Sequence, residues 1–248
     1  RRLMLATGSN GRVWQMLADL ALAIVDPVPS LFTFNIKDER LEGLPGLSVP
    51  DASLKISKSK LKAEGPLLIT HWGLSGPAIL RLSAWGAREL HQKEYQFSLH
   101  VNWLGNAKPE FLNEQLLDLS QSWAKKQILS ANPFQLPSRL WQRLASYAGV
   151  SEGMSWANLP KKVRQKLVSE LCEGRFVVNG KSTFKEEFVT AGGVSLKEIN
   201  FKHFAAKRWP RLWMAGEMLD IDAITGGFNF QAAWTGGWIA GGSMSEST

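Results

Sequence analysis

The chain has 248 residues, enough for one large domain or two smaller ones, and its 44% hydrophobic and 21% charged residues are typical of a folded protein. Its single cysteine, Cys172, excludes an internal disulfide framework and a cysteine-based zinc site. No segment reaches the roughly 18 consecutive apolar residues of a membrane-spanning helix, and no signal peptide is recognisable. These features predict a soluble intracellular protein without a membrane partner, in the cytoplasm or, alternatively, in an organelle.

The net charge of +7 at pH 7 leaves room for an acidic partner. Much of the excess positive charge lies in two clusters: Lys55, Lys58, Lys60 and Lys62, and Lys161, Lys162, Arg164 and Lys166. Aromatic residues do not alternate with these side chains, as they do in many RNA-binding motifs. We therefore interpret both clusters as solvated faces and expect no nucleic-acid partner. Attraction to the phosphates of a cofactor or substrate is the alternative.

The first 25 residues follow the pattern of a strand, a turn and a helix. Leu3 to Ala6 form an apolar strand, and the apolar residues from Val13 to Ala21 recur with helical spacing. The segment Asp26 to Pro29 is expected to end this helix, because proline removes a backbone donor. The chain does not begin with Met and opens almost directly on the apolar strand, which predicts a fragment of a longer protein.

Strands dominate the pattern between residues 30 and 107. Leu31 to Ile36 predicts one strand, and Tyr95 to Trp103 predicts a half-buried one, with alternate apolar side chains on one face. Between them Ser75-Gly76-Pro77 is expected to open a helix, because proline is tolerated at the first helical position. This part of the chain predicts a small barrel or sandwich that carries one helix.

Residues 109–172 change to a helical period. Asn179-Gly180 then predicts a hairpin between Arg175 to Val178 and Lys181 to Phe184. Leu212 to Ala215 is expected to be a buried strand, with a helix from about Gly227. The strand-and-helix pattern of an α/β domain occurs at both ends of the chain, so the middle is predicted to be an insertion into one α/β domain. A linear array of three domains is the alternative.

The segment richest in chemistry follows the strand Leu212 to Ala215. This strand delivers Gly216 and Glu217 at its carboxyl end, where open α/β sheets bind ligands. Glu217 can accept hydrogen bonds from ribose- or ribityl-type hydroxyls, and the helix opened by Gly226-Gly227 offers free N–H groups to a carbonyl oxygen or an anion. Two alternatives stay open here: a Gly-rich helix start without a ligand, and a divalent-metal site from Glu217, Asp220 and Asp222, whose spacing fits no standard calcium loop.

Four motifs together carry a resemblance to a known family. They are Ala6-Thr7-Gly8 after the first strand, Leu68 to Pro77, Val189 to Val194, and the run from Ala215 to Gln231 that contains Ala-Gly-Glu and Thr-Gly-Gly-Phe-Asn-Phe-Gln. In this order and over nearly the whole chain, they resemble the BaiN/YhiN-type family of NAD(P)/FAD-dependent oxidoreductases.

The resemblance implies an α/β fold in which a partial, Rossmann-like FAD/NAD(P)-binding domain is interrupted by an inserted β-barrel with a small helical subdomain. The FAD-binding domain would comprise residues 1–25 and 187–248, the barrel residues 26–108 and 173–186, and the helical subdomain residues 109–172. The residues expected to contact FAD are Ala6, Thr7, Gly8, Gly192, Gly193, Gly216, Glu217, Asp220, Gly226, Gly227, Phe228, Asn229 and Phe230.

The activity implied by the resemblance is the transfer of a hydride or electron pair between FAD and a small organic substrate, with an NAD(P)H link left open. No catalytic residue is assigned. The family's N-terminal Gly-rich pyrophosphate loop is absent from this sequence, so the chain alone is expected to bind FAD weakly or not at all and to be inactive. A fragment or interaction module that binds no cofactor is the alternative from another functional class.

Overall fold

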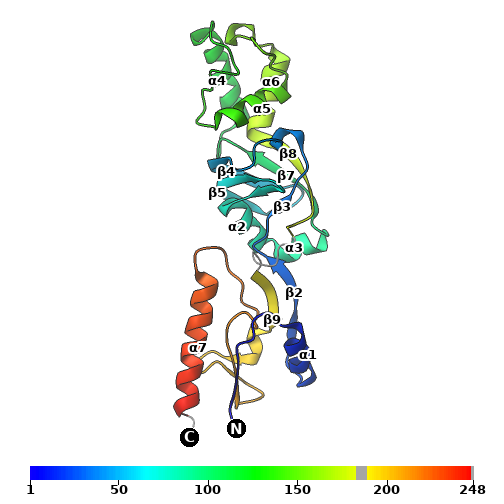
Figure 1. Cartoon of the computed structure of the whole chain (residues 1–248), viewed down its shortest axis with the longest axis vertical. Helices are drawn as coiled ribbons and strands as arrows, with labels where there is room; N and C mark the ends of the chain where they lie inside the picture. The colour runs from blue at the N-terminus through cyan, green and yellow to red at the C-terminus, as the bar shows by residue number, and fades with distance from the viewer. Residues whose placement is uncertain (183–188, 247–248) are drawn as a thin grey trace. The chain divides into compact units, whose positions relative to one another are not determined.

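The computed structural model describes residues 1–182 and 189–246 and divides the chain into two compact units (Figure 1). The first unit contains Arg1–Phe32, Ser83–Gln92 and Phe184–Thr248, and the second contains Thr33–Leu82 and Lys93–Thr183. Both chain ends thus belong to the first unit. In the described part of the chain, no helix is both long and apolar enough to cross a membrane.

The first unit is built on a four-stranded sheet in the order β1 (Leu3–Leu5), β12 (Leu212–Met214), β11 (Ala205–Ala206) and β10 (Ile199–Asn200). β1 and β12 are parallel, whereas the other two pairings are antiparallel. The expectation that the first apolar strand and the strand at Leu212 share a sheet is confirmed. Their parallel pairing places both carboxyl ends at one edge of the sheet, where Ala215 N donates to Leu5 O at 3.2 Å.

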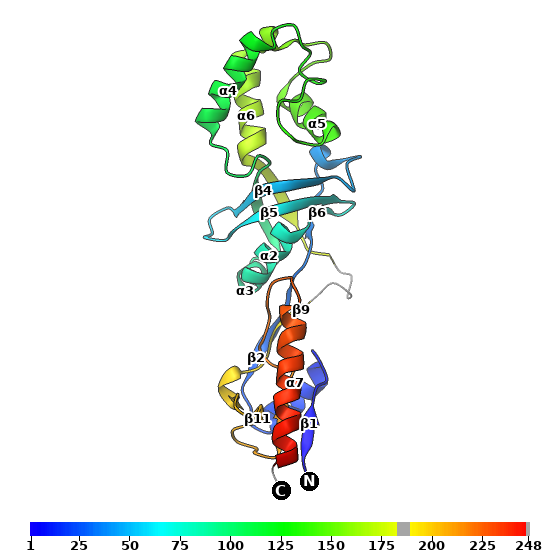
Figure 2. The ribbon, with the colours of Figure 1, turned by 90° about the vertical axis from the view of Figure 1, so that its left-hand side faces the viewer.

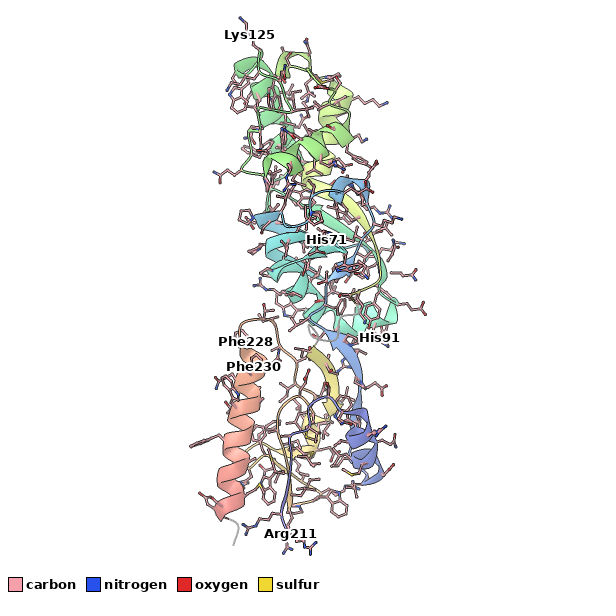
Figure 3. The ribbon with its side chains drawn as sticks, viewed as in Figure 1. His71, His91, Lys125, Arg211, Phe228 and Phe230 are labelled. Atoms are coloured by element: carbon pink, nitrogen blue, oxygen red, sulfur yellow. The ribbon has the colours of Figure 1, made fainter. Side chains whose placement is uncertain are left out.

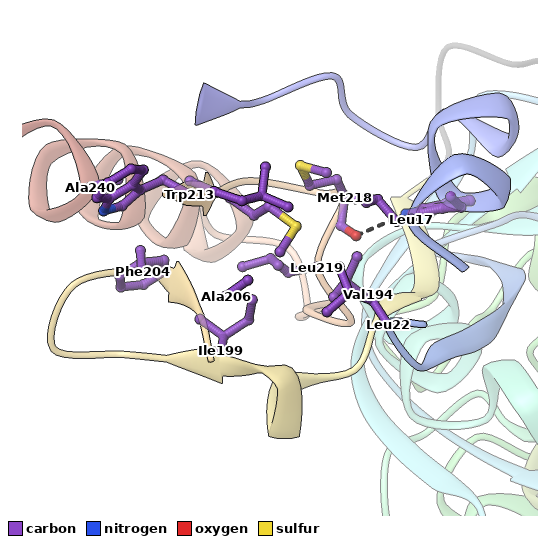
Figure 4. Close-up of a cluster of buried hydrophobic side chains, with 14 residues drawn as sticks. Leu17, Leu22, Val194, Ile199, Phe204, Ala206, Trp213, Met218, Leu219 and Ala240 are labelled. Carbon is purple, nitrogen blue, oxygen red and sulfur yellow. Dashed lines mark hydrogen bonds between the residues drawn. The ribbon is translucent and has the colours of Figure 1, made fainter. Parts of the chain in front are cut away.

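Two helices border the core of this unit. In α1 (Gly11–Asp19), Asn10 caps the helix by accepting from two backbone N–H groups, and Trp14 and Leu17 are buried. Trp14 Nε1 donates to Met218 O at 2.9 Å, which ties α1 to the segment after β12 (Figure 4). The second helix is α7 (Phe228–Glu246), whose start agrees with the expected helix from about Gly227. Its Ala240 belongs to the same buried cluster as Trp14 and Leu17.

The sequence pattern had predicted that the first helix runs as far as the proline-rich segment, but α1 is shorter. It ends at Asp19, and Asp26 to Pro29 lies instead in β2 (Ile24–Ser30), which pairs antiparallel with β9 (Val189–Val194). The two strands form a sheet of their own, with a break in register between Val25 and Val28. Pro27 falls at this irregularity, where the missing N–H costs no ladder hydrogen bond.

The second unit contains a six-stranded barrel that is nearly closed (Figure 2). Its order is β3 (Phe34–Asn35), β6 (Gly73–Ser75), β5 (Lys62–Thr70), β4 (Ser48–Ile56), β7 (Gln96–Asn102) and β8 (Gly174–Asn179). An isolated antiparallel bridge between Phe34 and Lys181 brings the two outer strands together. The predicted α/β class with a barrel insert is confirmed at this level, while the Rossmann-like character of the first unit stays a prediction.

Two strands and a hairpin were predicted in this part of the chain, and the structure agrees with them to different degrees. The alternation from Tyr95 to Trp103 is confirmed by β7, where Leu99 and Val101 are buried and Gln96 is exposed. The strand expected at Leu31 to Ile36 shrinks to β3, because Leu31 has a φ of 54°, outside the extended region. The hairpin at Asn179-Gly180 is wrong, because β8 pairs with β7 and Lys181 bridges to Phe34; Phe184 lies outside the described residues.

The described residues also contain the helices α2 (Pro77–Trp85), α3 (Ala87–Gln92), α4 (Pro109–Ser122), α5 (Ser138–Ala148) and α6 (Lys161–Glu173), with short 3-10 turns η1 (Glu39–Leu41), η2 (Trp156–Asn158) and η4 (Leu196–Glu198). α2 begins at Pro77, as expected. The helical period of residues 109–172 is confirmed by α4, α5 and α6, and the apolar stripe of α5 is buried.

Candidate functional site

A hollow of about 500 Å³ opens in the first unit beside the carboxyl end of β12 and the beginning of α7. Its lining is formed by Leu31, Val189, Gly216, Glu217, Ile221, Ile224, Thr225, Gly226, Gly227, Asn229, Phe230, Ala232 and Ala233. The hollow therefore combines an apolar wall with one carboxylate and the end of a helix. This is the composition usual for small-molecule sites, which are mostly apolar with a few placed polar groups.

Gly216 and Glu217 lie at the point where the chain leaves β12. Gly216 has a φ of +78°, a left-handed conformation that favours glycine, although a Cβ there would meet Ala233 Cβ at an ordinary 3.7 Å. Glu217 Oε1 accepts the backbone N–H of Thr190 at 2.7 Å, so the carboxylate is oriented by β9. Among the described residues no protein donor reaches its second oxygen.

The loop after Glu217 is held by contacts from distant parts of the chain. Leu219 N bonds to Gly216 O at 3.1 Å, and Asp220 N bonds to Val194 O at 2.9 Å. Arg88, on α3, forms an ion pair with Asp220 at 3.0 Å. Ser30 Oγ donates to Asp222 Oδ2 at 3.2 Å. Local sequence patterns gave no sign of Arg88 or Ser30, because both lie more than a hundred residues away in the chain.

Asn229 fastens the far end of the same loop. Its Oδ1 accepts from Ala223 N at 2.9 Å and its Nδ2 donates to Ala223 O at 3.1 Å. Both polar atoms of this side chain are therefore used inside the protein, and Asn229 acts on the hollow by fixing the loop. The backbone N–H of Asn229 is still a candidate for the expected cofactor contact, which stays a prediction.

The N-terminus of α7 supplies hydrogen-bond donors to the hollow. The bond from Gln231 N to Gly227 O, at 2.8 Å, is the first of the helix, so helical geometry provides no acceptor for the N–H groups of Phe228, Asn229 and Phe230. Figure 3 shows Phe228 and Phe230 at this helix start. Both rings are more than half exposed, and Phe230 stacks on Trp234 with ring centroids 5.9 Å apart.

The structure brings together six of the residues expected to contact FAD: Gly216, Glu217, Gly226, Gly227, Asn229 and Phe230. The others do not line this hollow. Ala6, Thr7 and Gly8 follow β1 at the same sheet edge, and Phe228 lines a neighbouring hollow together with Trp85 and Asp222. Asp220 is taken up by its ion pair with Arg88.

Gly192 and Gly193 are buried between two backbone segments. A Cβ on Gly192 would lie 2.6 Å from Pro27 Cα, and one on Gly193 would lie 2.5 Å from Met218 O. Their φ angles of +128° and +120° also exclude most side chains. Packing alone therefore accounts for glycine at both positions, and a contact with a cofactor stays a prediction.

The three carboxylates considered for a metal site have separate protein partners. Glu217 accepts from Thr190, Asp220 pairs with Arg88, and Asp222 accepts from Ser30. Within residues 1–182 and 189–246, no group of three or more His, Cys, Asp or Glu side chains is placed to hold one metal ion.

Asp222 gives this loop a dependence on pH. Burial, with the nearby Asp220, raises its pKa above the ordinary 3.8, against the Ser30 hydrogen bond and the charge of Arg88. A raised carboxyl pKa stabilises the folded protein below 3.8 and loses that contribution as the pH rises through the folded pKa.

We therefore expect Asp222→Asn, whose amide oxygen still accepts from Ser30, to gain stability relative to the wild type as the pH rises above 3.8. Urea denaturation at a series of pH values measures this difference. Asp19→Asn, an exposed substitution on α1, serves as the control. A stability difference for Asp222→Asn that is the same at every pH contradicts the prediction.

The topology can be compared with known proteins. Residues 28–189, which include the barrel and the helices α4, α5 and α6, match the family model described as "HI0933-like protein barrel and H2TH domain". The chain belongs to this HI0933-like family. The match agrees with the barrel-plus-helices insert that the motif resemblance implied.

Three curated relatives are enzymes. The chain is 32% identical to a ribosomal RNA dihydrouridine synthase from Escherichia coli over 202 residues, 81% of this chain and 47% of the relative. A protein of the same name from Haemophilus influenzae is 29% identical over 94% of this chain and 55% of its own length. A 3-dehydro-bile acid delta(4,6)-reductase from Clostridium scindens is 22% identical over 96% of this chain and 59% of its own length. The HI0933-like chain thus spans about half the length of these relatives.

These names correct one expectation. The lysine clusters without alternating aromatic residues had indicated that nucleic acid is not a partner. Two of the relatives are named for an activity on ribosomal RNA, which overturns that expectation. The reasoning failed because it required the aromatic pattern of dedicated RNA-binding motifs, whereas an enzyme can hold RNA through contacts to its backbone alone.

Proposed function

We propose that this HI0933-like chain forms part of the FAD site of a flavin-dependent reductase whose substrate is a uracil base in RNA. The observation that carries the proposal is the hollow at the carboxyl end of β12, where Glu217 and the N-terminus of α7 meet an apolar wall. Dihydrouridine is uridine with two hydrogens added across a carbon–carbon double bond. The names of the E. coli and H. influenzae relatives therefore support a reduction on RNA.

The residues present suit a flavin. The second oxygen of Glu217 suits the hydroxyl groups of a ribityl chain as an acceptor, and the N–H groups at the start of α7 are donors for a carbonyl edge that gains negative charge on reduction. The volume of about 500 Å³ lies within the range usual for small-molecule sites. Ile221, Ile224 and Phe230 provide apolar surface for a flat ring.

The cofactor, when bound, supplies the hydride, and NAD(P)H is the proposed source of the electrons. The chain's own residues bind and orient. Glu217 is positioned by Thr190, the loop is held by Arg88 and Asn229, and the helix end of α7 favours developing negative charge. Because the chain spans about half the length of its relatives, we propose that it supplies only part of the FAD site.

The test is a titration of the 248-residue chain with FAD, followed by flavin fluorescence. A partial site is expected to bind with a Kd of about 10 µM or weaker. Glu217→Ala is expected to weaken binding by about 10-fold to 100-fold, the range for a hydrogen bond to a charged group. Glu217→Gln removes the charge of the side chain, but its amide oxygen can still accept from Thr190. Its Kd is expected to fall between those of the wild type and Glu217→Ala.

Glu152→Ala, an exposed substitution in the second unit, is the matched control and is expected to leave the Kd unchanged. A Kd that Glu217→Ala leaves unaltered would rule out this hollow as the flavin site, whereas absence of saturable binding by the wild type would rule out that the chain alone holds enough of the site to bind FAD.

A further inference from the structure

A row of basic side chains crosses the outer face of the barrel. Lys62 on β5 is paired with Lys55 on β4, Lys55 with His100 on β7, and His100 with Arg175 on β8. These four residues, the basic row, thus occupy one register across four adjacent strands. At about 4.8 Å between neighbouring strands, the row extends over about 14 Å.

The basic row faces away from the barrel core. The residues next to it along the strands, among them Leu54, Val101 and Phe176, are fully buried, so alternation directs the row outward. Lys62, Lys55 and Arg175 are exposed and His100 is partly exposed. No aromatic side chain stands in the row.

Like charges lie next to each other in the row. Lys55 and Lys62 are directly opposite each other, an arrangement of like charges that destabilises a sheet. In the described part of the chain none of the four side chains belongs to an ion pair. A sheet with this arrangement gains stability when an anion binds across it.

The surface beside the row is hollowed and polar. Lys55, His100 and Arg175 line a hollow of about 650 Å³ that also contains Lys58. Two serines hold the side chains in place: His100 Nε2 and Ser57 Oγ share a hydrogen bond of 2.8 Å, and Arg175 donates to Ser98 Oγ at 2.9 Å and 3.1 Å.

The other end of this hollow is not basic. It contains Glu173 and Cys172, and burial, followed by the charges of Glu173 and Glu110, raises the pKa of the Cys172 thiol to about 11. The thiol is therefore neutral and unreactive at neutral pH. An anion is thus directed to the strand side of the hollow, over the basic row.

We propose that the basic row binds the phosphate backbone of an RNA strand. The choice of RNA among polyanions rests on the proposed function, whereas the surface itself rests on the strand register. Without aromatic residues for stacking, the row contacts phosphates and does not read the sequence. The role of the basic row is to position the RNA that carries the reacting base. This proposal replaces the earlier interpretation of Lys55 and Lys62 as residues of a solvated face.

The test measures the binding of a short fluorescein-labelled RNA stem–loop to the full chain by fluorescence anisotropy over a range of salt concentrations. The triple variant Lys55→Gln, Lys62→Gln, Arg175→Gln is expected to lose about 10-fold or more in affinity at low salt and to flatten the slope of log K against log salt by about 2. The variant Lys55→Arg, Lys62→Arg keeps the charges and is expected to retain wild-type affinity.

A charge-matched control lies in the helical part of the second unit, away from the basic row. Lys125→Gln, Lys161→Gln, Lys162→Gln removes the same charge from exposed positions in the turn after α4 and at the start of α6 (Figure 3 labels Lys125). It is expected to change the affinity less than twofold. An equal loss in the control, no loss in the row variant, or tighter row-dependent binding to phosphatidylserine vesicles than to RNA overturns the proposal. Circular dichroism checks that all variants are folded.

This binding assay contains no flavin, so it separates the two proposals. If RNA binding depends on the basic row while FAD binding does not depend on Glu217, the proposed function fails and this inference stands. If FAD binding depends on Glu217 while RNA binding is indifferent to the row, only this inference fails.

Discussion

Gly193→Ala is expected to destabilise the first unit by about 3 kcal/mol or more, because backbone strain and steric overlap add. Gly193 has a φ of +120°, and an added Cβ would lie 2.5 Å from Met218 O and 3.2 Å from Leu219 C. These neighbours are backbone atoms that cannot rotate away. Met218 O also accepts from Val194 N and from Trp14 Nε1, both at 2.9 Å, so moving it disturbs β9 and α1 together.

Two other glycines separate the causes. Gly227 has a φ of +84° with no atom near an added Cβ, so Gly227→Ala is expected to cost about 1–2 kcal/mol of strain alone. Gly237 lies within α7, also with open space, and Gly237→Ala is expected to stabilise by about 0.5–1 kcal/mol. Urea denaturation combined with hydrogen exchange of the Val194 amide measures all three. A Gly193→Ala cost no larger than that of Gly227→Ala contradicts the overlap argument.

The segment from Leu212 to Gly227 shows how much of the candidate site can be predicted from the sequence. The apolar run Leu212 to Ala215, followed by Gly216-Glu217 and later by Gly226-Gly227, has a local pattern, and its strand, its loop and the start of α7 were predictable. Local patterns also predicted β7 and the helical period of the segment that contains α5. In each case the periodicity of a single element determines its own burial.

What the sequence could not supply are partners between distant segments. The ion pair of Arg88 with Asp220 and the hydrogen bond of Ser30 to Asp222 depend on how α3 and β2 pack, which no local pattern encodes. The reading of Pro27 as a helix terminator failed for the same reason, because its place at a strand irregularity depends on β9. The basic row likewise exists only through the register of four strands.

Arg40 is the residue of the second unit whose removal we expect to be most costly, and it too is a long-range feature. Its side chain is almost fully buried and forms ion pairs with Asp38 at 2.6 Å and with Glu170 of α6 at 2.7 Å. It also donates to Arg175 O at 2.5 Å, and its guanidinium stacks 3.8 Å above the ring centre of Phe176. Arg40 therefore joins η1, α6 and β8.

Arg40→Met is expected to destabilise the second unit by about 3–5 kcal/mol, because it leaves two partly buried carboxylates without their counter-charge. The triple variant Arg40→Met, Asp38→Asn, Glu170→Gln removes the uncompensated charges and is expected to recover most of this loss. Urea denaturation of both variants, followed by the exchange of amides in β8, gives the comparison. A triple variant no more stable than Arg40→Met would show that packing of the guanidinium, and not its charge, dominates.

The pH dependence of stability in the wild type and in Arg40→Met tests the interaction of Arg40 with Asp38 independently. In the wild type, burial would raise the pKa of Asp38, but the hydrogen bonds and charge of Arg40 lower it below the ordinary 3.8. That contribution to stability is present above 3.8 and is lost as the pH falls through the folded pKa. In Arg40→Met the backbone N–H of residue 40 still donates to Asp38, but the guanidinium that opposed the effect of burial is gone. The pKa of Asp38 is therefore expected to rise, and Arg40→Met is expected to gain stability relative to the wild type as the pH falls toward 3.8. If the stability difference between the two proteins is constant with pH, Asp38 is not held in its charged form by Arg40.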